Sequence, residues 1–375
     1  MTIRSFVVVC VCLLLFSCQT RETYRVLDHA RVSEKKLSDL VEDYSVIPLE
    51  TTEDNLILDP TVVRFSGGHI YILDRFSPSK SLHVFSLEGK YVGKVGNRGE
   101  GPGEYLMPHS FAVNESAREL YVRDMAKNAL LVYSLDDRSF LRQCPVPFNA
   151  TCFALLDDGH FIWYLNAGLQ NDGRYSRHLQ VTDLACRPVA DAVDAMDFPS
   201  RGLYNVPSYF EESQGEVLFH HPFMGDYYRC SLQDSLALQP LFTLRFDGLS
   251  FADEGYIVRH REHIVQDLAS DHYIQWCTAL AGESTVLTFF GTGSECYWGR
   301  YDRRTSSGWY VDREHLEDDL GIGVMSRPKT IYQGRFVSFL SVENMDIDRL
   351  PENSVLRSYL SGSSKEVNPF IVLYK

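Results

Sequence analysis

The chain has 375 residues, of which 45% are hydrophobic and 13% aromatic, and its formal net charge is −14 at pH 7. This length is enough for one large β domain or two ordinary domains around a sizeable core. The acidic balance argues against nucleic acid as a partner, because phosphate contacts need clustered Lys and Arg. No run of five like charges occurs, so we expect no disordered charged tail.

The first 17 residues are expected to form a lipoprotein signal peptide. Arg4 precedes an apolar run, Phe6 to Phe16, which is too short to span a bilayer comfortably and is typical of a signal-peptide core. The run leads into Leu15-Phe16-Ser17-Cys18, which resembles the lipobox of bacterial lipoproteins. That resemblance implies cleavage before Cys18 and acylation of its sulfur, and two acyl chains anchor stably at ~0.8 kcal/mol per buried CH₂. The alternative is an ordinary signal peptide cut nearby.

These features divide the chain into a signal peptide (residues 1–17), a tether (18–40) and one folded domain (41–375). We expect the mature protein in the cell envelope, lipid-anchored in the outer membrane. In related lipoproteins, acidic residues just after the cysteine mark surface export, and "CQTRETY" contains only Glu22. This favours a periplasmic face and leaves surface exposure open.

Beyond the tether, short apolar stretches alternate with polar residues and are bounded by Gly, Asp, Asn and Ser, which is the pattern of β-strands. "TVVRFSGGHIYILD" and "SLHVFSLEGKYVGKVG" predict four strands, and "HSFAVNESARELYVRD" with "ALLVYSLDDRSFLRQC" repeats their order. In both units the second strand ends in an aspartate, Asp74 or Asp124. Less regular copies follow. Units of four strands every ~45–60 residues are typical of a β-propeller.

Two stretches near the ends of the mature chain each predict a single strand without a sequence neighbour. They are "DYSVIPLE" and "NPFIVLYK". We expect Val46 to Leu49 and Phe370 to Tyr374 to share one blade, because this closes the ring and removes exposed sheet edges. The predicted fold is therefore all-β: a six-bladed propeller of four-stranded antiparallel blades, closed by N- and C-terminal strands.

The stretch "KVGNRGEGPGEYLMP", residues 94–108, is expected to be a corner between two blades. Its glycines allow positive φ and close backbone approach, Pro102 stiffens the turn, and Tyr105 fills the gap between blades. A phosphate-binding loop would need a following helix and a Lys-Ser/Thr end. A β run containing Pro108 follows instead, so the nucleotide interpretation is rejected.

Blade corners and the loops between second and third strands share one face of a propeller. Polar groups that converge on such a concave mouth are the default hypothesis for ligand binding. The alternative is that they solvate loops and pair with one another. The candidate binding residues are Asp74, Arg75, Arg98, Glu100, Glu104, Asp124 and Lys127.

The whole mature chain resembles the six-bladed, NHL-like propeller lipoproteins of Gram-negative bacteria that degrade complex glycans. The resemblance rests on the lipobox, "GNRGEGPGEY", "NPFIVLYK" and "DDLGIGVMSRPKTI", in which Asp319, Leu320 and Gly323 match the family and Gly321 replaces an expected acid. It implies a fold and an address in the envelope. It implies no agreed activity.

Other constellations carry weak signals. Metal binding was weighed at His260, His263 and Asp267, and at Asp346, Asp348 and Glu352; a solvated helix or loop is the favoured interpretation, and we expect no metal or cofactor. Paired acids for glycoside hydrolysis occur at Glu211 and Glu212 and at Glu317 to Asp319, but adjacent acids on a strand point opposite ways.

After Cys18 the mature chain has six cysteines, at positions 144, 152, 186, 230, 277 and 296. An exported chain meets an oxidising compartment, so pairing is possible, although most of these cysteines lie in apolar stretches that favour buried free thiols. Cys144 and Cys152 flank the short turn "PVPFNA" and are the pair we would test.

We therefore expect a monomeric binding or interaction propeller, anchored to the membrane by lipid and serving glycan capture or envelope assembly, with a glycan or an envelope protein as ligand. The alternative is a hydrolase or lyase that acts on extracellular polysaccharide.

Overall fold

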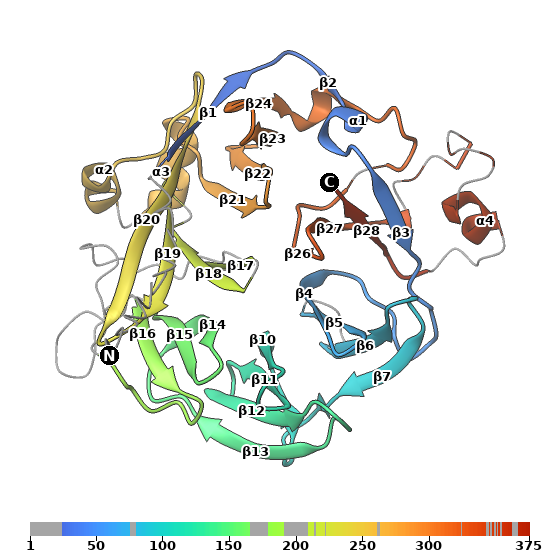
Figure 1. Ribbon diagram of the computed structural model, residues 1–375, viewed down its shortest axis with the longest axis vertical. Coiled ribbons are helices and arrows are strands. Elements are labelled where there is room, and N and C mark those ends of the chain that lie inside the picture. The colour runs from blue at the N-terminus through green and yellow to red at the C-terminus, as the bar shows by residue number, and fades with distance from the viewer. Residues whose placement is uncertain are drawn as a thin grey trace, which may run out of the picture.

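The computed structural model describes residues 25–375 except 76–79, 166–178, 191–208, 214, 222, 261–262, 324, 343–344, 346, 349, 351, 353–354 and 362–366. In the described part, the sheets are arranged radially around a common centre, as in a β-propeller (Figure 1). The first strand of each antiparallel unit lies nearest the centre. These inner strands are β4 (Pro60–Ser66), β10 (Pro108–Asn114), β14 (Ala150–Asp157), β17 (Phe210–Ser213), β21 (Trp276–Ala281) and β26 (Thr330–Tyr332).

The first two units are four-stranded sheets, as the sequence predicted. The first joins β4 to β5 (His69–Asp74), β6 (Leu82–Ser86) and β7 (Tyr91–Val95). The second joins β10 to β11 (Glu119–Asp124), β12 (Ala129–Ser134) and β13 (Phe140–Pro145). Each is antiparallel, with its strands in chain order.

The later units depart from the expected separate four-stranded blades. β14 pairs with β15 (His160–Leu165) and β16 (Leu179–Asp183) in a three-stranded sheet. One nine-stranded sheet holds the next two antiparallel units. These are β17 with β18 (Glu216–His220), β19 (Asp226–Leu232) and β20 (Leu236–Phe246), and β21 with β22 (Thr285–Thr292), β23 (Glu295–Asp302) and β24 (Ser307–Asp312).

The strand that merges these two units is β1 (Arg25–Arg31), which lies between β20 and β24 and runs parallel to both. The sequence analysis assigned residues 18–40 to a tether, but β1, β2 (Lys35–Lys36) and α1 (Leu37–Leu40) all belong to the folded domain. β2 pairs with β25 (Leu316–Glu317), so this N-terminal segment follows the outside of the ring (Figure 1).

The last sheet joins both ends of the folded domain. β27 (Arg335–Leu340) lies between β26 and β28 (Phe370–Tyr374), and β28 pairs in turn with β3 (Tyr44–Ile47). Val46 lies opposite Val372, so the predicted pairing of the terminal strands is confirmed. The expected strand extended to Leu49, whereas β3 ends at Ile47.

Helices are few and lie outside the sheets. α2 (Glu254–Arg259) and α3 (Ile264–Ser270) follow β20, where the sequence predicted a helical insertion. Asp253 caps α2 by accepting a hydrogen bond from the Tyr256 amide at 2.6 Å. η1 (Arg313–His315) follows β24, α4 (Val355–Ser361) precedes β28, and the short strands β8 (Asn97–Arg98) and β9 (Glu104–Tyr105) pair within the corner.

Apolar side chains fill the spaces between neighbouring units. Val84 and Val95 of the first sheet and Val122 and Leu131 of the second belong to one cluster, with Tyr105 of the corner fully buried between them. The predicted role of Tyr105 is thereby confirmed. Burial raises the pKa of Tyr105 to about 12, so its hydroxyl stays protonated and accepts a hydrogen bond from the Leu82 amide at 3.2 Å.

Candidate functional site

The corner at residues 94–108 is held by its own hydrogen bonds. Gly103 has φ +72°, and a Cβ there would lie 2.6 Å from Cβ of Phe140, so the position requires glycine. The Glu104 carboxylate accepts a hydrogen bond from the Gly101 amide at 2.8 Å. The Nζ of Lys127 donates to the carbonyl of Glu104 at 2.6 Å and to those of Glu100 and Gly101 at 3.3 Å.

Asp74 and Asp124 occupy equivalent positions and fasten the chain that enters each inner strand. The Asp124 carboxylate, which is fully buried, accepts hydrogen bonds from the amides of Leu106 at 2.7 Å and Met107 at 3.1 Å. Asp74, also fully buried, accepts from Leu58 at 2.9 Å. The aspartate that recurs at the end of the second strand is therefore a structural anchor in both units.

The remaining predicted residues separate into two groups. Arg98 and Glu100 are exposed on the corner. Arg75 instead lies toward the centre, where its Nη1 donates to Nε2 of His109 at 2.6 Å. Burial and the neighbouring Arg75 lower the pKa of His109 to about 3, so this imidazole is neutral and can accept the hydrogen bond. Of the seven candidates, Arg75 is the one whose charge acts on the groups in the ring centre.

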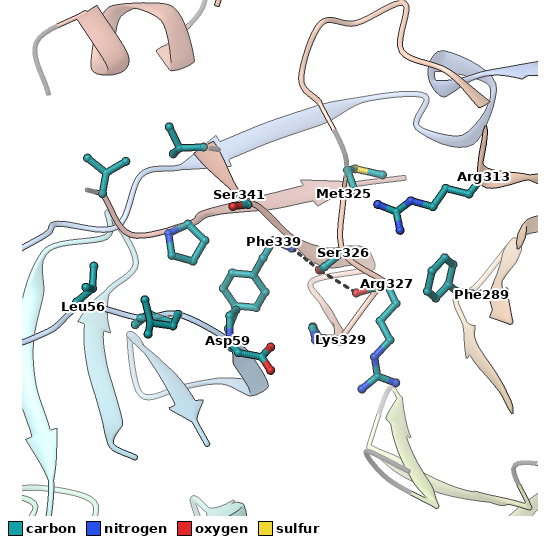
Figure 2. Close-up of a pocket in the computed structure, with 16 residues that line it drawn as sticks. Leu56, Asp59, Phe289, Arg313, Met325, Ser326, Arg327, Lys329, Phe339 and Ser341 are labelled. Atoms are coloured by element: carbon teal, nitrogen blue, oxygen red, sulfur yellow. Dashed lines mark hydrogen bonds between the residues drawn. The ribbon is translucent and has the colours of Figure 1, made fainter. Parts of the chain in front are cut away.

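A pocket of about 520 Å³ lies where the sheet of β26, β27, β28 and β3 meets its neighbours (Figure 2). Arg313, Arg327, Lys329 and Asp59 are the charged residues that line it (Figure 2). Most of the lining comes from the segments that enter β4, β26 and β28 and from the end of β27. The lining residues are Leu56 to Pro60, Phe289, Arg313, Met325 to Arg327, Lys329, Phe339, Ser341, Val342, Val367 and Pro369.

Local sequence explains why Arg327 and Lys329 point the same way. Pro328 favours an extended conformation at the preceding residue, and in extended chain residues i and i+2 lie on one face. The backbone on either side is fixed: the Ser326 amide donates to the Phe339 carbonyl at 2.9 Å and the Lys329 amide to the Val337 carbonyl at 2.7 Å. The Ser326 hydroxyl accepts from the Phe339 amide at 3.0 Å and donates to the Arg327 carbonyl at 3.1 Å (Figure 2).

The electrostatics of this cluster favour a negatively charged ligand. Burial and the nearby Arg327 lower the pKa of Lys329 to about 7, against the opposing effect of Asp59. Burial also lowers the pKa of Arg327, and its Nη1 donates to Oγ1 of Thr278 at 3.1 Å. Two cations held this close gain from an anion that would replace the solvent between them.

A smaller cavity of about 50 Å³ lies beside the pocket and shares Arg327 and Lys329 with it. Arg64 of β4 and Glu212 of β17 form an ion pair at 2.7 Å across this space. Glu211 is mostly buried and lies 3.7 Å from Nε2 of His220. The two adjacent acids thus face different partners, as alternation along a strand predicts.

The histidines and acids that the sequence analysis weighed for metal binding or catalysis have other partners. His260 Nδ1 lies 2.9 Å from the Asp267 carboxylate, and the Asp319 carboxylate accepts hydrogen bonds from the Ser38 amide at 3.0 Å and its hydroxyl at 2.6 Å. Asp318 accepts from the Gly323 amide at 2.8 Å. Asp346 and Cys18 lie outside the described residues. Within the described chain, no three His, Cys, Asp or Glu side chains gather in a way that would hold a metal ion.

The structure does not bring Cys144 and Cys152 together. Cys144 packs between the second and third sheets with Cys186, whereas Cys152 packs on the other side of the third sheet, with Cys230. Thiols in different core clusters cannot bond without rearrangement.

Sequence reasoning missed the cationic residues of the pocket. It singled out "DDLGIGVMSRPKTI" for its acids and glycines, while Arg327 and Lys329 in the same stretch line the pocket. The available signal was the Arg-Pro-Lys alternation just before an inner strand.

The radial sheets define a propeller-like protein, and the pocket of about 520 Å³ is large enough for a small ligand. Residues 25–375 match the family described as "Domain of unknown function (DUF4934)", and the chain belongs to this family. Among the described residues, no helix is long and apolar enough to cross a membrane.

Solved structures share the fold. A Bacteroides fragilis protein described as exported matches with TM-score 0.82 and 22% identity, over 93% of this chain and 99% of that one. A member of the DUF4221 family from Bacteroides vulgatus matches with TM-score 0.52 and 8% identity, over 89% and 97% of the two chains. These similarities show the fold alone.

A shorter similarity exists to a curated enzyme. Peptidyl-glycine alpha-amidating monooxygenase of Mus musculus is 25% identical over 122 residues, or 31% of this chain. The matched part spans 12% of the monooxygenase.

Proposed function

We propose that this protein is an extracytoplasmic, lipid-anchored binding propeller whose pocket beside the sheet of β26, β27, β28 and β3 captures an anionic group of an extracellular ligand. The observation that carries the proposal is the convergence of Arg313, Arg327 and Lys329 on one cavity of about 520 Å³. In a chain with net charge −14, cations gathered in one concavity create a local field opposite to that of the whole molecule. A carboxylate or sulfate matches the planar donor group of arginine.

The ligand class that we propose is an acidic glycan. Phe289 and Met325 give the pocket apolar surface beside its cations, a combination that suits a sugar ring bearing a charged substituent. The likeness to an exported Bacteroides protein supports an extracytoplasmic address, and the lipobox at Cys18 supports a lipid anchor. An acidic segment of an envelope protein is the competing ligand.

We count the ring as six blades, with β1 bridging the fourth and fifth. Three features support this count. Six antiparallel units occur in chain order, the inner strands of most neighbouring units contact one another, and a separate apolar cluster lies at each junction between units. On this count, we propose that the domain is related in fold to the NHL-like propellers.

A glycan array tests the binding proposal. The mature protein should bind uronate- or sulfate-bearing glycans, and Arg327→Gln should lower the signal about tenfold or more, since a charged hydrogen bond contributes about 1.5–3 kcal/mol. Arg304→Gln is the matched control, because Arg304 is exposed on a hairpin far from the pocket lining. Equal binding of neutral and acidic glycans, or equal loss in both variants, would contradict the proposal.

One observation favours an enzyme as the second candidate. A lysine whose pKa is about 7 can serve as a general base, and an adjacent arginine can hold the carboxylate of a uronate. Lyase action would then cleave an acidic polysaccharide by removing a proton next to that carboxylate. Incubation with acidic polysaccharides should in that case release unsaturated products from the wild type but none from Lys329→Met; binding without products leaves the binding function.

A further inference from the structure

Cys144 and Cys186 lie against each other at the junction of two sheets. Cys144 is in β13, and Cys186 is in the turn after β16. Both belong to the apolar cluster between the second and third sheets, with 6% and 2% of their surfaces exposed. The two thiols are close enough to influence each other's pKa, and Sγ of Cys144 lies 4.0 Å from the carbonyl oxygen of Leu184, two residues before Cys186.

The turn that carries Cys186 is fixed and strained. Cys186 has φ +63°, a left-handed conformation that residues with a Cβ rarely adopt. Its amide donates to the Asp183 carbonyl at 3.0 Å, and the Asp183 carboxylate accepts from the amides of Ala185 and Arg187 at 2.9 Å each. Such strain persists where the surroundings hold it, and here it accompanies a thiol placed against another thiol.

The surroundings also separate the two thiols chemically. The interaction with Cys186 and the charge of Arg142 lower the pKa of Cys144, although burial opposes this. The same interaction and burial raise the pKa of Cys186. Cys144 is therefore the more acidic thiol of the pair, and it is also the more exposed of the two.

We propose that Cys144 and Cys186 form a disulfide that joins the second and third sheets. The thiolate of Cys144 attacks one sulfur of an exogenous disulfide, forms a mixed disulfide and releases one thiolate. Cys186 then gives up its proton and attacks Cys144 Sγ, which releases the second thiol. The two protein sulfurs are oxidised and the exogenous disulfide is reduced to two thiols, which take up the proton from Cys186 and the proton that Cys144 had already released to solvent. This step needs an oxidising compartment but is independent of any ligand of the pocket.

The remaining cysteines provide the contrast. Cys152 and Cys230 pack among apolar side chains of the next cluster, and the Cys277 thiol contacts the Tyr227 hydroxyl. Burial raises the pKa of Cys230 to about 12, which keeps it an unreactive thiol.

Peptide mapping under controlled oxidation tests this proposal. The full mature protein, purified in detergent, is reduced, exchanged into oxidised glutathione, alkylated under denaturing conditions and digested. The wild type should give a peptide linked through Cys144 and Cys186, and Cys186→Ser should instead retain glutathione on Cys144. Cys152→Ser is the matched control and should keep the link. Alkylation of both Cys144 and Cys186 in the wild type, or a link to another cysteine, would overturn the proposal.

Discussion

At the scale of single residues, the pocket places positive charge where solvent is scarce. The pKa of Lys329 is lowered as a result. Arg327 and Arg75 repel the protonated lysine, whereas Asp59 and Glu211 attract it. Burial is the largest of these effects, so the lysine is close to half-protonated near pH 7. An anion in the pocket would favour the protonated form.

This linkage predicts a pH-dependent affinity. Because the anion binds the ammonium form better, its affinity should be highest below pH 7 and should fall as the pH rises through about 7. His109, with its pKa at about 3, stays neutral in this range and adds no slope. Titration calorimetry with an acidic oligosaccharide from about pH 5.5 to about pH 8.5, on either side of that pKa, measures the effect.

Lys329→Arg is the control for this experiment, because a guanidinium remains charged throughout the range. Its affinity should be nearly independent of pH. If the variant keeps the slope of the wild type, Lys329 is not the titrating group.

Substitution of Asp124 is predicted to change the stability of the fold and not the affinity for a ligand. Besides Leu106 and Met107, its carboxylate accepts hydrogen bonds from the amides of Ala126 at 2.9 Å and Lys127 at 3.3 Å. Asp124→Ala leaves these buried donors unpaired and should lower the free energy of unfolding by about 3 kcal/mol. Asp136→Ala, at a surface ion pair with Arg118, should change it by less than about 1 kcal/mol. Urea unfolding of both variants compares them, and equal effects would refute the anchoring role of Asp124.

These residues also show what sequence could and could not predict about the site. Composition and position predicted a ring of polar binding residues, but Asp74, Asp124 and Lys127 form hydrogen bonds with backbone groups of the adjoining loops. Sequence alone does not reveal which polar side chains such loops will use. The sequence analysis did not identify Arg327 and Lys329 as binding residues, because it interpreted that stretch by its acids and glycines.

At the scale of elements, the pairing of the terminal strands β3 and β28 was predictable from the sequence. The insertion of β1 between β20 and β24 was not. "NPFIVLYK" and "DYSVIPLE" were unpaired apolar strands, and only each other could complete a blade. β1 reads "RVLDHAR", with charges along most of its length, and it pairs with strands some 200 to 280 residues away in sequence. Nothing local marks such a parallel insertion between two outer strands.

Removal of β28 predicts the largest loss of stability. All five of its residues are buried, and it lies between β27 and β3. A chain ending at Pro369 leaves both neighbouring strands with unpaired backbone groups. Each such group costs about 1–3 kcal/mol, and several together exceed a typical stability margin of about 5–15 kcal/mol. The truncated protein should be insoluble or should melt far below the full chain in a thermal scan. An unchanged melting temperature would show that β28 does not close the ring.

At the scale of the whole molecule, a lipid anchor on Cys18 would place the ring close to a membrane. Seven residue-to-residue steps lead from Cys18 to the start of β1 at Arg25. Fully extended, they reach roughly 25 Å. The radial sheets then present the pocket within a short distance of the bilayer.

Cys18→Ala tests this anchor. The variant should accumulate as unprocessed or soluble protein and should not incorporate a fatty-acid analogue, whereas Cys296→Ala should behave like the wild type. Partition of Cys18→Ala into a detergent phase to the same extent as the wild type would refute lipidation at this residue.

The central claim is that the pocket lined by Arg327 and Lys329 binds an anionic ligand, and a crystal structure of the protein soaked with an acidic oligosaccharide tests it most directly. We predict a carboxylate or sulfate within hydrogen-bonding distance of Arg327 and Lys329, with density for the ligand lost in Arg327→Gln. Oligosaccharide bound elsewhere on the protein, with this pocket free of it at saturating concentration, would contradict the account.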